Sequence, residues 1–198
     1  MYDPKEIVRC RWVNDDPLYI RYHDEEWGVP NHDDQKWFEL LTLEGAQAGL
    51  SFYTVLKKRQ RYREVMDDFD PELVAQYDAA KIENLLQDAG IIRHRGKLNA
   101  TVKNAQAFLR VQQEFGSFDH YIWAFVSGVP IVNHHQVPGD VPGSNELSDR
   151  LSKDLKKRGF TFVGSTICYA LMQASGMIDD HWEYCICRTR HNTESQEA

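Results

Sequence analysis

Apolar residues recur along much of this chain at intervals of three or four positions, which is the period of a helix that buries one face. Residues 34–43 follow this pattern, and so do residues 144–159, where leucine recurs every four positions. No segment alternates between apolar and polar residues for long enough to predict a strand. The pattern therefore predicts an all-α fold.

Residues that cap helices or end them predict where these helices lie. Ser51 and Asp78 are the expected N-caps of helices that continue to about residues 59 and 89. Gly90 lies where a helix C-terminus favours a left-handed residue, and Gly96 is expected to open a long helix to about residue 108. We expect a last apolar helix over residues 165–175.

The length and composition of the chain favour one folded unit. Its 198 residues, 42% of them hydrophobic, are enough to bury a core without a metal ion. Three prolines and several glycines predict a long loop over residues 128–143. We expect residues 1–188 to form a single compact helical unit and residues 189–198 to form a polar tail.

Targeting signals and membrane segments are not evident in the sequence. No stretch approaches twenty apolar residues, and residues 1–10 carry charges of both signs. We therefore expect a cytoplasmic protein without membrane contacts. Four cysteines in such a protein favour metal binding or simple burial over disulfides, because cytosolic thiols stay reduced. No heptad repeat or self-complementary strand is present, so we expect a monomer.

The net charge of −7 argues against long-range attraction of a polyanion to the whole surface. Lysine and arginine nevertheless gather in three groups, at residues 57–63, 93–103 and 153–158. A solvated helix face explains each group taken alone. Any surface for nucleic acid must therefore be local.

Cysteine and histidine occur near both ends of the chain, as Cys10 with His23 and as His181 with Cys185. The four-residue spacing of the second pair places both side chains on one face of a helical turn. Zinc binds such groups tetrahedrally, and four protein ligands would make the site structural. Simple burial is the alternative, and spacing leaves other residues open as ligands: Cys187, His134, His135 and His191.

Residues 86–97 predict the end of one helix, a tight apolar connection and the start of the next. Backbone N–H groups at a helix N-terminus bind anions, and Arg93, Arg95 and Lys97 add positive charge nearby. The segment resembles a helix-hairpin-helix DNA-binding element. An ordinary helical corner with solvated cations is the alternative.

Glu44 is a lone carboxylate in residues 43–52, a segment that otherwise has no charge and contains two glycines. It is either a surface or capping residue, or a buried acceptor aimed at a ligand. Aromatic residues crowd the same part of the chain, and most aromatic residues in globular proteins belong to the core. They are Trp12, Tyr19, Tyr22, Trp27, Trp37, Phe38, Phe52 and Tyr53.

Six short motifs between residues 9 and 187 point to one protein family. In order along the chain they read RCxW, DPLYI, YHDxEWGVP, LEGxQAGLS, DAGIIRHRGK and KKRGFxFVG. Together they resemble the constitutive bacterial type I 3-methyladenine DNA glycosylases. The resemblance implies the helix-hairpin-helix glycosylase fold, with the hairpin element at about residues 80–110.

The resemblance also implies a zinc site and a base pocket. The zinc ligands would be Cys10, His23, His181 and Cys185, which join residues 9–28 to residues 177–188. In the pocket, the catalytic residues Glu44 and Tyr22 would hydrogen-bond the modified adenine between Trp12 and Phe52. The family has tryptophan where this chain has Phe52, so we expect lower affinity for the base.

The implied activity is hydrolysis of the N-glycosidic bond of 3-methyladenine in alkylated double-stranded DNA, with release of the free base. The nucleotide would rotate out of the duplex, and Leu50, on the Gly49-Leu50 step, would fill its place. DNA would also meet the hairpin residues Arg93, Arg95, Gly96 and Lys97. The protein would then associate with the nucleoid.

Two other functions are compatible with parts of the sequence. One is a non-enzymatic binder of alkylated DNA, which the presence of Glu44, Tyr22 and Trp12 disfavours. The other is a zinc hydrolase, which a site closed by four ligands disfavours. Related enzymes of the superfamily use an aspartate after the hairpin, but Asp119 is better explained as part of a helix start.

Overall fold

The computed structural model describes residues 8–136 and 140–188, so the expected polar tail lies outside the described residues. Helices dominate, as predicted: α1 (Pro17–Glu25), α2 (Asp34–Gln47), α3 (Phe52–Leu56), α4 (Arg59–Val65), α5 (Pro71–Val74), α6 (Ala79–Gln87), α7 (Arg95–Phe115), α8 (Phe118–Trp123), α9 (Glu146–Lys157) and α10 (Ser165–Ala174). Two 3-10 turns, η1 (Asp67–Phe69) and η2 (Ala124–Val126), follow α4 and α8.

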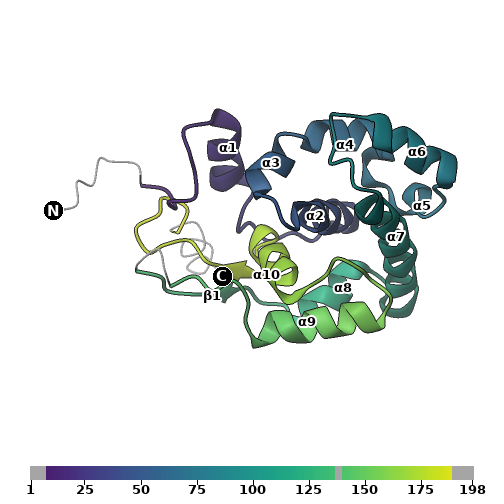
Figure 1. Cartoon of the computed structure of the whole chain (residues 1–198). Coiled ribbons are helices and arrows are strands. Elements are labelled where there is room, and N and C mark those ends of the chain that lie inside the picture. Colours follow the sequence, from purple (N-terminus) through teal and green to yellow (C-terminus); the bar gives the residue numbers. More distant parts are fainter. Residues whose placement is uncertain (1–7, 137–139, 189–198) are drawn as a thin grey trace.

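Helix α2 lies at the centre of the fold, with α7, α8, α9 and α10 arranged around it (Figure 1). Its residues 37–46 are all buried, although a surface helix would expose one face. Complete enclosure carries polar side chains into the interior together with apolar ones. Glu39 and Glu44 are therefore both buried, at 7% and 2% exposure.

Several predicted helix boundaries differ from those in the structure. Ser51 does cap a helix, but α3 ends at Leu56 and α4 starts separately at Arg59. Helix α7 starts at Arg95 with His94 as its N-cap and continues to Phe115, past the expected end near residue 108.

Gly90 is not left-handed, contrary to the prediction, because α6 already ends before Asp88. A glycine is still required there, since an added Cβ would lie 2.5 Å from Cγ of Arg61. The long loop holds a strand that was not predicted, β1 (Ile131–Val132), which pairs in parallel with β2 (Ile178–Asp179). Such short strands depend on a distant partner and leave no periodic pattern.

The N-terminal and C-terminal segments lie together. The backbone N–H of Ile186 donates to the carbonyl of Val8 at 3.0 Å. Ile131 pairs with Ile178 in the sheet, which brings the long loop to the same segment. Within the part of the chain that the structure describes, no helix combines the length and apolar character needed to cross a membrane.

Gly176 ends α10 at a point where the backbone of the α1–α2 connection passes very close. Its φ is +72°, and an added Cβ would lie 2.4 Å from Pro30 N and from the carbonyl carbon of Val29. We expect Gly176→Ala to destabilise the fold by at least about 2 kcal/mol more than Gly116→Ala, because backbone must move. Gly116 is a matched control, since its φ is +87° and nothing lies within 4 Å.

Urea unfolding of both variants measures the difference. Equal losses of about 1 to 2 kcal/mol would show that only the left-handed backbone matters at these two glycines.

Candidate functional site

A cavity of about 420 Å³ opens beside α2, within the size range of small-molecule sites. Helices α1, α2, α3 and α10 contribute to its wall, together with Asp180 and Trp182. Six aromatic side chains line it: Trp12, Tyr19, Tyr22, Trp27, Phe52 and Trp182. The structure therefore brings together all four residues that the resemblance assigns to the base pocket.

The aromatic rings converge on one another around this space. The ring centroids of Tyr22 and Phe52 are 4.9 Å apart, and Trp12 lies 5.0 Å from both Tyr19 and Trp27. Trp12 is 36% exposed, whereas Tyr22 is buried, so the Trp12 ring lies nearer to solvent. Apolar ring faces of this kind suit a flat aromatic ligand.

Glu44 differs sharply from the other buried glutamate of the same helix. Glu39 accepts hydrogen bonds from Arg63 at 2.7 Å and from Lys36 at 3.3 Å. Glu44 Oε2 has no hydrogen-bond partner among the described residues, and burial raises the pKa of Glu44 to about 8. A buried carboxyl without a compensating cation is typical of a ligand-binding or catalytic site.

Tyr22 reaches the cavity from α1 and is 3% exposed. Burial raises the pKa of its hydroxyl well above the ordinary value, and the nearby Glu44 adds to the shift. The guanidinium of Arg59 lies 6.0 Å from the ring centroid and is paired with Glu26. Tyr22 is therefore a protonated hydroxyl in an apolar wall.

Three of the four predicted metal ligands lie together. His23, His181 and Cys185 form a buried group with Cys187, in which the donor atoms lie within 4.8 Å of one another. Cys10 packs against Cys185 and Cys187 in the same apolar cluster. The structure thus gathers five candidate donors where a tetrahedral ion needs four.

The two histidines are held in a way that suits metal binding. Nδ1 of His23 lies 2.7 Å from Asp24 Oδ1, and Nδ1 of His181 lies 2.8 Å from Asp179 Oδ1. Nε2 of His181 is buried and has no partner among the described residues. Carboxylates on Nδ1 that leave Nε2 for the ion are the usual support of zinc-bound histidine.

The other histidines considered from spacing lie elsewhere. His134 is largely exposed beside Glu183, and His135 is hydrogen-bonded to Asp180 at 2.8 Å. His191 lies outside the described residues.

The predicted DNA-contacting residues occupy two turns. Leu50 is 43% exposed and follows Gly49, whose φ is +79°, in the connection between α2 and α3. At the start of α7, Arg95 pairs with Glu83, while Nζ of Lys97 binds the carbonyl oxygens of residues 46 and 48 at 2.8 and 2.6 Å. Lys97 therefore caps the end of α2.

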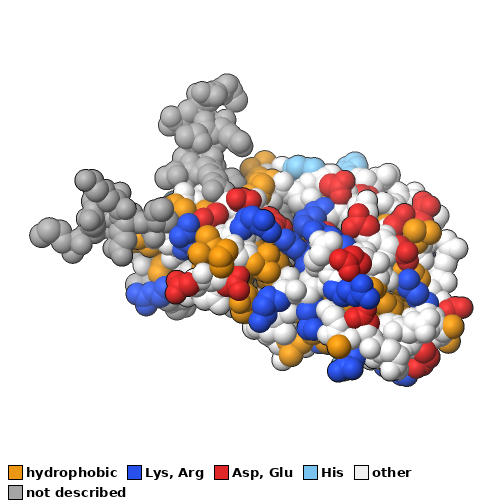
Figure 2. Space-filling view, turned by 90° about the horizontal axis from the view of Figure 1, so that it is seen from above, with side chains coloured by type: hydrophobic (Ala, Val, Ile, Leu, Met, Phe, Trp, Pro, Cys, Tyr) orange, Lys and Arg blue, Asp and Glu red, His pale blue; other side chains and the backbone are white. Residues whose placement is uncertain are grey.

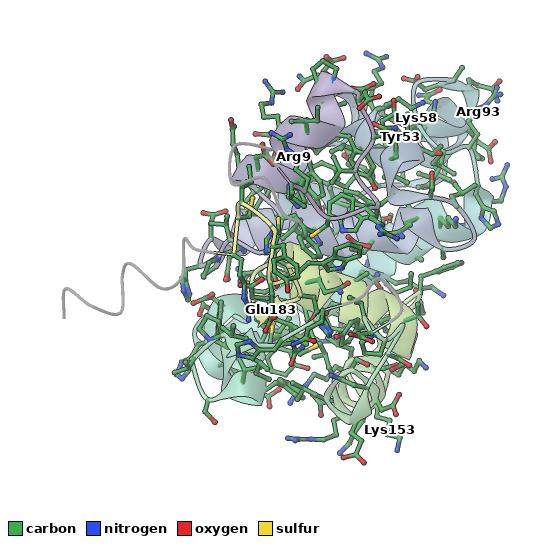
Figure 3. All side chains as sticks on the ribbon, turned by 90° about the vertical axis from the view of Figure 1, so that its left-hand side faces the viewer. Arg9, Tyr53, Lys58, Arg93, Lys153 and Glu183 are labelled. Atoms are coloured by element: carbon green, nitrogen blue, oxygen red, sulfur yellow. The ribbon has the colours of Figure 1, made fainter. Side chains whose placement is uncertain are left out.

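The three basic groups do not form one surface. Lys58 and Arg93 lie at one end of the molecule and Lys153 at the opposite end (Figure 3). On the face shown in Figure 2, lysine and arginine are interspersed with aspartate and glutamate. Many of the arginines have acidic partners, among them Arg61 with Asp88. A nucleic-acid surface would have to be local, as the net charge indicates.

Asp119 stands in the first turn of α8, which Ser117 caps, as predicted. It accepts a hydrogen bond from Nε1 of Trp37 at 3.0 Å and does not line the cavity.

Sequence reasoning assigned four of the thirteen residues that line the cavity and missed the other nine. Tyr19 and Gln47 lie three residues from Tyr22 and Glu44 on the same helices, so helical spacing was a usable signal. Arg11 and Trp27 also lie close in sequence to predicted positions. The other lining residues come from distant segments, which no local pattern connects to the site: Val141, Ala170, Gln173, Asp180 and Trp182.

The helical fold, the aromatic cavity and a buried carboxyl without a partner among the described residues define a class of protein with a site suited to a flat ligand that donates hydrogen bonds. The family model for methyladenine glycosylase matches residues 12–189. DNA-3-methyladenine glycosylase 1 of Escherichia coli (strain K12) is 53% identical over 181 residues, which are 91% of this chain and 97% of the relative. This chain belongs to the methyladenine glycosylase family.

Further relatives agree over the same length. DNA-3-methyladenine glycosylase of Haemophilus influenzae is 51% identical over 182 residues, covering 92% of this chain and 98% of that protein. A structure of 3-methyladenine DNA glycosylase I from Staphylococcus aureus, described as the structural basis of 3-methyladenine recognition, has a TM-score of 0.90 at 39% identity. It covers 94% of this chain and 99% of its own.

The burial of Glu44 predicts how the free energy of unfolding depends on pH. Folding raises the pKa of Glu44 to about 8, so the unfolded chain loses this proton at lower pH than the folded one. Between about pH 5 and pH 8, this group should lower the free energy of unfolding by about 1.4 kcal/mol per pH unit. Glu44→Gln removes the effect, so its stability relative to the wild type should increase with pH.

Urea unfolding across this pH range measures the difference between variant and wild type. Glu39→Gln is the control, because it removes a buried carboxylate of the same helix that is paired with Arg63 and Lys36. A difference for Glu44→Gln that stays flat with pH would contradict the prediction.

Proposed function

We propose that this protein is a base-excision repair glycosylase that hydrolyses the N-glycosidic bond of 3-methyladenine in alkylated double-stranded DNA. Membership of the methyladenine glycosylase family and the names of its relatives support this activity. The observation that carries it is the buried, unpaired Glu44 in an aromatic cavity. That arrangement fits a cationic aromatic base better than a neutral one.

Recognition follows from the charge on the damaged base. Methylation at N3 makes the nucleoside base cationic, and aromatic faces attract a cation through their quadrupoles. Burial favours the protonated form of Glu44 in the free protein, and a cation within hydrogen-bonding distance lowers its pKa again. The ionised carboxylate then accepts a hydrogen bond from the exocyclic amino group of the base, with Tyr22 beside it.

Bond cleavage needs little further assistance because the leaving group is already activated. The bond between C1′ and N9 breaks, and its electron pair stays on N9 and neutralises the positive charge of the base. Water adds to C1′ and loses a proton, which leaves free 3-methyladenine and an abasic sugar. Asp119 takes no part, since it binds Trp37 outside the cavity.

Duplex DNA would meet the two turns beside the cavity. The helix-hairpin-helix element of α6 and α7 would hold a phosphate at the α7 N-terminus, through backbone N–H groups near Gly96 and the positive charge of Arg93 and Arg95. Leu50 would fill the space that the flipped nucleotide leaves. We propose that the protein acts as a monomer in the cytoplasm and associates with the nucleoid through this contact.

We propose that a structural zinc ion is held by Cys10, His23, His181 and Cys185. The support is the buried group of thiols and imidazoles with carboxylates on both Nδ1 atoms. Bound metal supplies only a cross-link between the two terminal segments, because four protein ligands leave no position for substrate. Cys187 lies in the same group and is the competing fourth ligand.

Replacing the carboxylate tests the proposed activity. We expect wild-type protein to release 3-methyladenine from methylated duplex DNA, and Glu44→Gln to release it about 10- to 100-fold more slowly, since a charge-assisted acceptor is lost. Chromatography of the released bases measures both rates. Asp119→Asn serves as a control that retains activity. If Glu44→Gln releases 3-methyladenine as fast as the wild type, the Glu44 carboxylate does not recognise the base.

Metal content tests the zinc proposal without reference to activity. Elemental analysis of purified protein should find one zinc per chain in the wild type and in Cys187→Ala, and none in Cys10→Ala. Chelation should lower the melting temperature, with activity lost only as the fold is lost. Retention of zinc by Cys10→Ala and its loss from Cys187→Ala would replace Cys10 by Cys187 as ligand. Activity loss in a fully folded chelated protein would favour the hydrolase alternative.

A further inference from the structure

Helix α2 presents two unmatched acceptors to the same cavity. Oε2 of Glu44 and Oε1 of Gln47 are both buried and have no hydrogen-bond partner among the described residues, and both side chains line the cavity. Residues three apart share one face of a helix, so the two groups face the same part of the wall. A buried acceptor without a donor is costly, and a ligand with two N–H groups relieves both costs.

Where α10 and Asp180 line the cavity, no buried acceptor of the described residues lacks a hydrogen-bond partner. Asp180 accepts four hydrogen bonds, from Asn133, His135, Tyr169 and Gln173, at 2.6 to 2.8 Å. Nε2 of Gln173 is used in one of them, so that amide is already committed within the protein. The unmatched acceptors of the cavity therefore belong to α2.

The last turn of α2 is held firmly by its surroundings. Nζ of Lys97 binds the carbonyl oxygens of residues 46 and 48, on either side of Gln47. The carbonyl of Gln47 itself accepts from the backbone N–H of Leu50 at 2.6 Å. Three successive carbonyls are thus occupied, which fixes the backbone from which the Gln47 side chain extends. An acceptor on a fixed backbone can discriminate between ligands.

We infer that Gln47 is a specificity-determining residue whose side-chain carbonyl accepts the second N–H of the adenine amino group. The inference rests on the proposed function, in which Glu44 accepts the first N–H of that amino group. Guanine carries an oxygen where adenine carries this amino group, so its lone pairs would face two acceptors. The pair on α2 would therefore exclude 3-methylguanine and admit 3-methyladenine.

A neutral acceptor is also what this position requires electrostatically. A second carboxylate one helical turn from Glu44 would raise the pKa of both groups, and the two would share a proton. Such a proton would turn one of them into a donor for the guanine oxygen. The glutamine carbonyl adds an acceptor without adding charge.

Removing the acceptor while keeping the shape of the side chain tests the inference. Methionine has similar length and flexibility, so Gln47→Met should fill the same space, and Gln47→Ala should fold readily at this half-buried helix end. The rates of 3-methyladenine and 3-methylguanine release are measured from the same methylated DNA. We expect both variants to release 3-methyladenine about tenfold more slowly, with 3-methylguanine release unchanged or faster.

Gln173→Met is the matched control, because it removes an amide that lines the cavity from α10 and already has a partner, Asp180. It should change the two rates by the same factor and leave their ratio at the wild-type value. The inference is overturned if the Gln47 variants also change both rates equally, or if Gln173→Met shifts the ratio as much. Failure of the wild type to release 3-methyladenine would remove the proposed function itself, and the inference with it.

Discussion

The enclosure of α2 on all sides is the constraint on which the rest of the structure depends. A helix that is buried all round cannot direct its polar residues to solvent, so each one needs a partner inside the protein. Arg63 and Lys36 supply that partner for Glu39. Among the described residues none is supplied for Glu44, which lines the cavity instead. The same packing that forms the core thus creates a site that is incomplete without a ligand.

Lys97 connects this central helix to the hairpin that precedes α7. From the sequence, we expect Lys97 to add positive charge for a phosphate. In the structure, its ammonium group binds the last carbonyls of α2. This contact joins the start of α7 to the end of α2. The turn that carries Gly49 and Leu50 follows directly from the helix end that Lys97 holds, so the hairpin, the exposed turn and the cavity form one connected unit.

Helix periodicity and capping residues predicted most of the helices, because both are local properties. Ser51, Asp78 and Ser117 cap helices as expected. The break between α3 and α4 was missed because no proline or glycine marks it. Arg59, the first residue of α4, is held by a partly buried ion pair with Glu26, which is distant in sequence. The paired strands were missed for the same reason, since each depends on a segment far away in sequence.

For the candidate site, the motifs located the residues of α1, α2 and α3 but not those from the C-terminal half. Trp182 and Asp180 enter the cavity only because the terminal segment folds back against residues 131–135. Spacing also could not choose between Cys10 and Cys187, because both lie next to Cys185 in the folded chain. Such choices are made by tertiary contacts and leave no trace in a local pattern.

A neutral adenine and its N3-methylated form differ little in shape, so selection between them has to come from charge. In the free protein, burial favours the protonated form of the Glu44 carboxyl. A neutral base carries no positive charge that would stabilise the ionised carboxylate in an apolar cavity. A cationic base does, because its charge compensates the buried carboxylate directly. Under the proposed function, the burial of Glu44 would therefore select for charge. The undamaged base would have to be bound by a neutral acid, whereas the damaged base would convert that acid into its own counter-ion.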